Sequence, residues 1–141
     1  MAAEDVEVVE RWYEAYNARD LERLLELMHE DVDLTSAGMS GVEGSSHVGH
    51  VGMRRYFADL WETWEDPTVE VEHLLDRGEL VVMLGSTSGK GRLSGMDVVL
   101  EVATVIRVED GRIRHYRTYR DWTEALQAAG AVDSAPRARG G

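Results

Sequence analysis

Thr104 is the residue of this sequence whose surroundings most clearly suggest chemistry. From Met96 to Val108 the even positions are apolar except Thr104, while the odd positions include Asp97, Glu101 and Arg107. Period-two alternation of this length predicts a strand with one buried face. A single threonine on that face is where a polar group inside a cavity would lie.

Two histidines, His47 and His50, are three residues apart and would face the same way on a helix. Two nitrogen ligands without a third histidine or acid at suitable spacing make a poor metal site. We therefore expect no metal and no cofactor. Solvated or packing histidines are the simpler interpretation, and a role for His50 as a pocket acid or base stays open.

The carboxylates are better explained as surface charges than as catalytic groups. Asp31 and Asp33 stand at the entry to an expected strand, and such residues are mostly exposed. Asp97 and Glu101 share the outer face of the long strand. That position favours solvent or a dimer contact over catalysis.

Large aromatic side chains at helical spacing are a second feature that could serve a ligand. Trp12 and Tyr16 fall on one expected helix, and Phe57, Trp61 and Trp64 fall on another. Such a cluster belongs first to the core, because aromatic side chains bury large apolar areas. It is also the best candidate wall for a flat apolar ligand, since small-molecule pockets are mostly hydrophobic with few polar groups.

The composition argues against several kinds of partner. A formal net charge of −12 at pH 7 argues against nucleic acid, because phosphate binding requires a basic face. The sequence shows no basic segment followed by an apolar run, so we expect no signal peptide, no membrane partner and a cytoplasmic location. Cysteine is absent, which removes a thiol nucleophile and any disulfide. The 141 residues suffice for one domain with one core.

The first half of the chain must position its aromatic residues with helices. Helical spacing predicts a helix over residues 4–18 and, after the N-cap Asp20, a short helix through Met28. A strand is expected over 32–36. A glycine- and serine-rich loop over 37–52 would then cover the cavity mouth, and a third helix would run to about Trp64.

The pattern of the second half of the chain predicts strands. Pro67 ends the connection after the third helix, because proline cannot continue a helix. Strands are expected over 68–75, 79–88, 96–108 and 112–120, with turns at 76–78, 89–91 and 109–111. A last helix is capped by Asp121 and stops at Gly130, and residues 131–141 are expected to be a disordered tail.

This order predicts an α+β domain, in which helices cover one face of a curved, mostly antiparallel sheet. Four segments then carry a family resemblance, namely residues 8–21, 52–57, 110–113 and 119–126. In order, they resemble the helix-turn-helix opening, third-helix entry, last turn and carboxyl-terminal ending of the nuclear transport factor two-like superfamily. That group includes the SnoaL-like polyketide cyclases, ketosteroid isomerase and limonene epoxide hydrolase. The resemblance covers residues 4–130 and implies a cone-shaped half-barrel, covered by three helices, with an interior pocket.

The resemblance also implies where catalytic groups would stand. The isomerase's oxyanion-hole tyrosine falls on Trp12, its base on Ser36 and its buried acid on Thr104. Thr118 stands where the cyclases carry an aspartate and where the hydrolase carries one of its groups. The strand for the hydrolase's other groups, residues 80–85, is apolar or glycine. A fold alone supplies no reaction, so whether the chain is an enzyme stays open.

By the same resemblance Tyr116, Thr118 and Arg120 point into the pocket, although outward exposure of Arg120 remains the alternative because a buried arginine must be paired. An inward Arg120 would be the only cation there and would bind a carboxylate, enolate or phenolate. The candidates for a catalytic role are His50 and Arg120. The expected pocket residues are Trp12, Tyr16, Ser36, Phe57, Trp61, Met83, Thr104, Tyr116, Thr118 and Arg120.

Three functions stay open at this point. The first is binding of a small, largely apolar ligand, anionic in one version. The second is a small-molecule isomerase, cyclase or hydrolase that acts by proton transfer, and the third is a non-catalytic association domain. We also expect a homodimer through the outer sheet face, because Val99, Ala103 and Val105 make it more apolar than solvent exposure requires.

Overall fold

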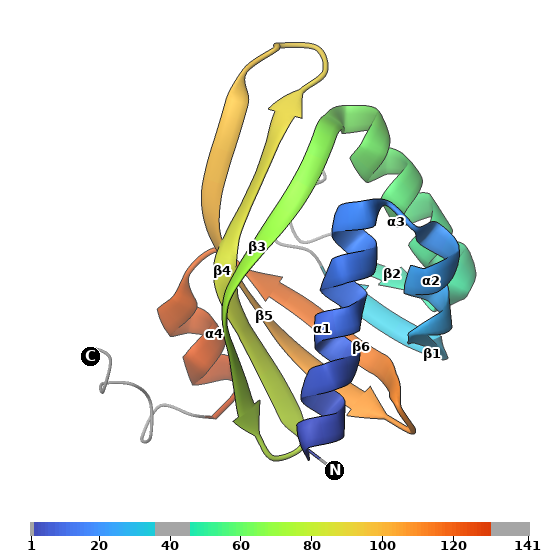
Figure 1. Ribbon diagram of the computed structural model, residues 1–141, viewed down its shortest axis with the longest axis vertical. Coiled ribbons are helices and arrows are strands. Elements are labelled where there is room, and N and C mark those ends of the chain that lie inside the picture. Colours follow the sequence, from blue (N-terminus) through green and yellow to red (C-terminus); the bar gives the residue numbers. More distant parts are fainter. Residues whose placement is uncertain (1, 36–45, 131–141) are drawn as a thin grey trace.

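The computed structural model describes residues 2–35 and 46–130, which form four helices and one six-stranded sheet (Figure 1). The helices are α1 (Ala2–Ala18), α2 (Leu21–Glu26), α3 (Gly49–Thr63) and α4 (Trp122–Ala128). The strands are β1 (Met28–Thr35), β2 (Ser46–Val48), β3 (Trp64–Arg77), β4 (Leu80–Gly91), β5 (Asp97–Glu109) and β6 (Arg112–Tyr119). None of these helices is both long and apolar enough to cross a bilayer. The expected α+β class is confirmed.

The sheet is open and mixed, with strand order β2-β1-β6-β5-β4-β3. Every pairing is antiparallel except β1 with β6. Helices α1, α2 and α3 lie on one side of the curved sheet, and α4 lies on the other (Figure 1). The main core fills the space between the three helices and the sheet, where Val9, Trp12, Leu24, Phe57 and Ile106 are almost fully buried.

Both expected helix caps are confirmed. The Asp20 carboxylate accepts a hydrogen bond from the backbone N–H of Arg23 at 3.1 Å. The Asp121 carboxylate accepts from the N–H groups of Thr123 at 2.7 Å and Glu124 at 3.4 Å. These carboxylates satisfy N–H groups that have no acceptor inside the helix, which fixes where α2 and α4 begin.

The loop expected over 37–52 is wrong in its second half. Residues 46–48 pair with β1 as strand β2, and α3 already begins at Gly49, while residues 36–45 and the expected tail lie outside the described residues. Gly49 and Gly52 both lie within α3, so neither of them ends a helix. Gly49 has a φ of 73° at the turn into α3, a conformation that glycine adopts without strain. At Gly52, inside α3, a Cβ would lie 3.3 Å from the backbone of His47, so this glycine permits close packing.

Several strand boundaries also differ from the expectation. Met28 opens β1 instead of ending α2, and β3 begins at Trp64, so that Pro67 lies inside a strand. Because β3 is the last strand in the sheet order, a proline without an N–H is tolerated there. The turn expected at 89–91 lies further on, because Lys90 still pairs with Asp97 across β4 and β5.

The long strand β5 buries its even face over only part of its length. Thr104 is fully buried, whereas Leu100 is 48% exposed and Met96, just before the strand, is 65% exposed. The reason is that β4 and β5 extend as a hairpin beyond the helices (Figure 1). On the odd face, Ala103 is fully buried because α4 packs on it. Part of the face expected to form a homodimer is therefore covered within the chain, although Val99 stays 71% exposed.

Candidate functional site

A cavity of about 380 Å³ lies between the helices and the inner face of the sheet. Tyr16 of α1 and Tyr56 of α3 line it from the helix side. Strands β3, β4, β5 and β6 supply its other walls, and most of the lining side chains are apolar or carry only a hydroxyl. The strand residues that carry the argument below are Val69, Met83, Thr87, Leu100, Glu101, Thr104, Tyr116 and Thr118, followed by Arg120 after β6.

Strand pairing brings the polar side chains of the cavity together. Thr104 of β5 lies opposite Thr118 of β6 and opposite Met83 of β4. Alternate residues of a strand point to the same face, so Tyr116, Thr118 and Arg120 reach the cavity from one strand and its end. The single threonine in the apolar half of β5 is thus fully buried at the cavity wall.

Tyr13 of α1 links two of these side chains through its hydroxyl. Its Oη lies 2.8 Å from Thr104 Oγ1 and 2.8 Å from Tyr116 Oη. Tyr13 is 2% exposed and is not itself among the lining residues. The three hydroxyls therefore form one continuous hydrogen-bonded chain that connects the core to the cavity wall.

Burial raises the pKa of Tyr13, Tyr16 and Tyr116 above the ordinary tyrosine value. Loss of solvation is the largest cause for each, because it disfavours the phenolate. For Tyr16 and Tyr116, repulsion from the neighbouring phenols in their ionised form raises the pKa further, whereas hydrogen bonds to Thr104 and Tyr116 partly offset the rise for Tyr13. These phenols therefore stay neutral near pH 7 and serve as hydrogen-bond donors, not as bases.

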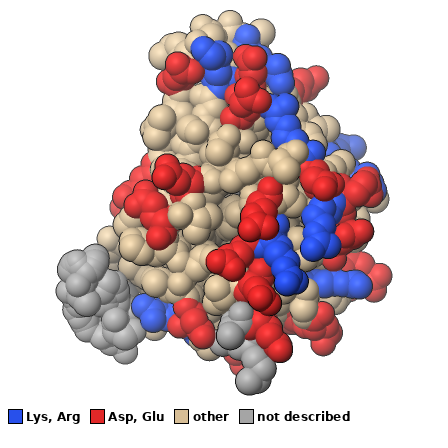
Figure 2. Space-filling model, in the orientation of Figure 1, with Lys and Arg blue, Asp and Glu red and all other residues tan. Residues whose placement is uncertain are grey.

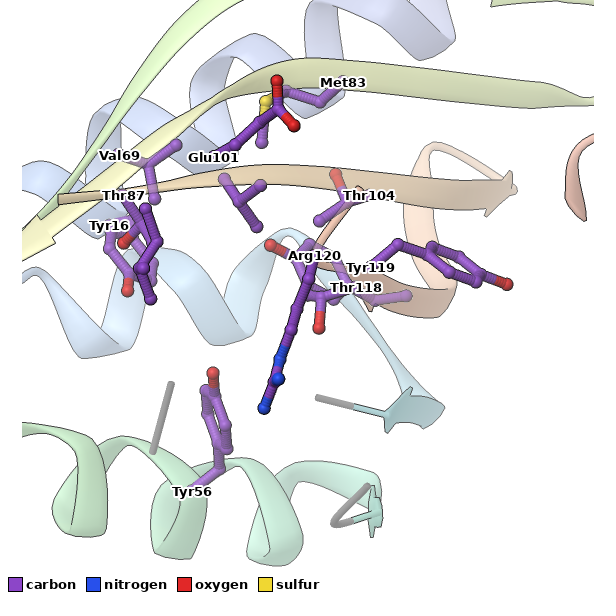
Figure 3. A pocket seen from close by; sticks show the side chains of 13 residues that line it. Tyr16, Tyr56, Val69, Met83, Thr87, Glu101, Thr104, Thr118, Tyr119 and Arg120 are labelled. Carbon is purple, nitrogen blue, oxygen red and sulfur yellow. The ribbon is translucent and has the colours of Figure 1, made fainter. Parts of the chain in front are cut away.

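Charged side chains occur at the mouth of the cavity. Glu101 and Arg120 are the charged lining residues, and both are exposed. In Figure 3 the Arg120 side chain extends across the mouth toward Tyr56, whose hydroxyl points into the same space, while the Glu101 carboxylate points away from it. The Arg120 side chain therefore lies at the entrance of the cavity.

The structure brings six of the ten expected pocket residues to the cavity, namely Tyr16, Met83, Thr104, Tyr116, Thr118 and Arg120. Trp12 and Phe57 lie behind the wall, 1% and 0% exposed, because their rings pack on Tyr16 at centroid distances of 5.7 and 6.0 Å. Trp61 packs on Phe57 from the far side, 5.3 Å away. Ser36 lies outside the described residues.

The histidines are placed away from the cavity. His50 Nε2 is 2.9 Å from the backbone carbonyl of Met28, a contact that holds the start of α3 to β1. The His47 ring packs edge-on against Tyr56 at 5.2 Å. Within residues 2–35 and 46–130, no group of three or more metal-ligating side chains comes together.

Comparison with known proteins places this arrangement in a family. No curated protein matches the sequence. The model of the SnoaL-like domain matches residues 9–116, which span the chain from the first helix into the last strand.

Solved structures of other proteins share the fold. A nuclear transport factor two-like protein of unknown function from Burkholderia pseudomallei is 23% identical, with 88% of this chain and 95% of that chain covered and a TM-score of 0.76. IdmH, a candidate polyketide cyclase from Streptomyces antibioticus, is 24% identical, with 89% and 98% covered and a TM-score of 0.70. TerC, co-crystallised with polyporic acid, is 21% identical, with 90% and 98% covered and a TM-score of 0.74. Because the family model spans most of the chain, this protein belongs to the SnoaL-like domain family.

Proposed function

We propose that this protein binds a small, largely apolar ligand in the cavity and holds an acidic group of that ligand beside Arg120. The observation that carries this proposal is the distribution of polarity along the cavity wall. Apolar side chains such as Val69 and Met83 form the interior together with side chains that carry a hydroxyl. The charged residues Glu101 and Arg120 lie at the mouth. Apolar walls with a few placed polar groups are typical of small-molecule sites.

Binding is favoured over acid–base catalysis because the described lining residues hold no histidine and no buried carboxylate. General acid–base catalysis works best with a group whose pKa lies near the working pH. The buried phenols have pKa values displaced in the wrong direction.

A reaction by proton transfer is the second candidate, and the neighbour IdmH, a candidate polyketide cyclase, favours it. In that case a bound water or a group of the substrate would have to act as the base. The neighbour TerC was co-crystallised with polyporic acid, and an acidic ligand for this protein is in keeping with that.

The test compares a carboxylic acid with its neutral amide, using 2-naphthoic acid and 2-naphthamide in isothermal titration calorimetry. Arg120→Met should weaken the acid by about 1.4- to fivefold and leave the amide unchanged, because an exposed ion pair contributes about 0.2 to 1 kcal/mol. Arg117→Met is the matched control, since Arg117 is an exposed arginine of β6, three residues before Arg120, and does not line the cavity. Equal losses for acid and amide, or no loss, would show that Arg120 does not select anions.

A further inference from the structure

One stretch of β5, residues 97–101, has a sheet edge that no described strand occupies. The pairing of β5 with β6 ends where Ala103 lies opposite Tyr119. The pairing of β5 with β4 continues beyond that point, as far as Asp97 opposite Lys90. In Figure 1 this stretch forms the left edge of the hairpin that projects above the helices. Among the described residues, it therefore has a neighbouring strand on one side only.

The closing bond of the hairpin shows which main-chain groups point to this open edge. The C=O of Met96 accepts from the N–H of Gly91 at 2.9 Å, so it points toward β4. The main-chain groups of successive residues in a strand point to opposite edges. The N–H and C=O groups of Asp97, Val99 and Glu101 therefore point away from β4, and such a row can pair with another extended segment.

The other edges of the sheet are poor places for an added strand. At one end of the sheet, β2 is only 3 residues long. At the other end, β3 contains Pro67 and its register against β4 shifts twice. Prolines and bulges of this kind block strand addition. By contrast, β4 and β5 pair without a shift, and residues 97–101 include no proline.

The outer face of the sheet beside this edge carries an excess of negative charge. Two rows of paired residues cross β3, β4 and β5 there, namely Glu65, Lys90 and Asp97 in one row and Glu70, Ser86 and Glu101 in the other. The Lys90 ammonium lies 3.4 Å from the Asp97 carboxylate. Four carboxylates thus share one ammonium, and Asp97 and Glu101 are both exposed at the edge. A segment that approaches this edge is favoured if it is basic.

A second copy of the chain fits this edge poorly. Two copies related by a two-fold axis would pair antiparallel, and a pairing centred on Val99 uses the whole of residues 97–101. Asp97 of one copy would then lie opposite Glu101 of the other copy. Like charges directly opposite each other destabilise a strand pair. The homodimer expected through the outer face is a different contact, because it uses side chains on the face and leaves the edge open.

We propose that residues 97–101 of β5 bind an extended, basic segment of a partner protein as an added antiparallel strand. Basic side chains of that segment lie opposite Asp97 and Glu101 on the outer face. Its alternate apolar side chains cover Val98 and the half-exposed Leu100 on the inner face. Main-chain hydrogen bonds supply affinity, and the alternation supplies specificity. The proposal concerns the strand edge and does not depend on a ligand in the cavity.

The probe is a fluorescein-labelled Lys-Val-Lys-Val-Lys-Val-Lys peptide, and its binding is followed by fluorescence anisotropy. The same peptide with glutamine in place of lysine should bind about two- to thirtyfold more weakly, because two exposed ion pairs are lost. In the proposed antiparallel strand the N–H groups of the lysines bond to β5, and those of the valines point outward. Methylation of the lysine backbone nitrogens should therefore abolish binding, whereas methylation of the valine nitrogens should leave it unchanged.

A matched pair of protein variants tests the same edge from the other side. Val99→Pro removes the central N–H of the open edge without removing a bond to β4, and proline is tolerated on an edge strand. It should abolish binding of the lysine–valine peptide. Val99→Ala keeps the N–H and should bind the peptide as the wild type does. Far-ultraviolet circular dichroism checks that both variants fold, and the methylated peptides decide the question on wild-type protein if Val99→Pro does not.

Three results would overturn the proposal. The first is absence of binding of the lysine–valine peptide, and the second is equal binding of the two methylated peptides. The third concerns the alternative occupant. If the light-scattering mass of the free protein falls for Val99→Pro but not for Val99→Ala, a second copy occupies the edge. Equal binding of the lysine and glutamine peptides would overturn the preference for a basic segment.

Discussion

Raising the pH above 10 should destabilise this protein through its buried phenols. Burial raises the pKa of Tyr13, Tyr16 and Tyr116 above the ordinary value of 10.0, which they regain when the chain unfolds. Above pH 10 the unfolded state therefore binds fewer protons than the native state, and the free energy of unfolding falls as pH rises. Below that pH all three phenols are protonated in both states, so they contribute no pH dependence.

The size of the effect follows from the number of phenols whose pKa is raised, namely Tyr13, Tyr16 and Tyr116. One proton of difference changes the free energy of unfolding by about 1.4 kcal/mol per pH unit, so three give about 4 kcal/mol per pH unit once the unfolded tyrosines are ionised. A typical domain has a total stability of about 5 to 15 kcal/mol. The chain suits this measurement because it has no cysteine and its only lysine is Lys90, so few other groups titrate in this range.

The assay is urea denaturation followed by circular dichroism, from about pH 9 to about pH 11, with the absorbance of tyrosinate recorded in parallel. Tyr16→Phe should reduce the slope by about a third, because one of the three phenols with a raised pKa is removed. Reversible titration of all 5 tyrosines near pH 10 with the native dichroism intact would refute the reasoning.

Two further predictions concern packing and assembly. In Gly85→Ala the new Cβ would clash with the backbone oxygen of Glu70, so we expect the free energy of unfolding, measured by urea denaturation, to fall by about 1 to 3 kcal/mol. The control is Gly89→Ala, whose Cβ would meet Trp64 at an ordinary 3.4 Å. Equal losses of stability for both variants would contradict this explanation. The part of the outer face that α4 leaves uncovered, around Val99, is expected to hold a homodimer, and a light-scattering mass near 15.8 kDa at micromolar concentration would exclude it.

The fold could be predicted where one local pattern decides the structure. The caps Asp20 and Asp121 and the alternation around Thr104 are such patterns, because each depends on residues within one or two turns or along one strand. The exposure of Leu100 and the burial of Ala103 could not be predicted in this way. They depend on how far the helices reach along β5 and on where α4 folds back, and period-two alternation carries no information about either.

Part of the candidate site could likewise be predicted from the sequence, and part of it could not. Thr104 stands out as one polar residue in an apolar run, whereas Tyr13 lies in the same apolar helical row as Val9 and Tyr16 and looks like any core aromatic. Helical spacing predicts that this row is buried, but the partner of each hydroxyl depends on pairing across 91 and 103 residues. The signal that could have found Tyr13 is the need of a buried threonine for a partner, combined with the packing of α1 over the sheet.

The parallel pairing of β1 with β6 also constrains how a newly synthesised chain can fold. Leu34 pairs with Tyr116, and the Tyr13 hydroxyl bonds to the same tyrosine. The amino-terminal third of the chain therefore cannot complete these contacts until the last strand has been synthesised. Translation at about 5 to 20 residues per second takes roughly 5 to 20 seconds to cover the 103 residues between Tyr13 and Tyr116. During that interval β1 lacks its parallel partner strand, and the Tyr13 hydroxyl lacks Tyr116. Closure of the domain is therefore a late event, completed only when β6 has left the ribosome, and a chaperone that shields the unpaired edge of β1 on the nascent chain would act in this window.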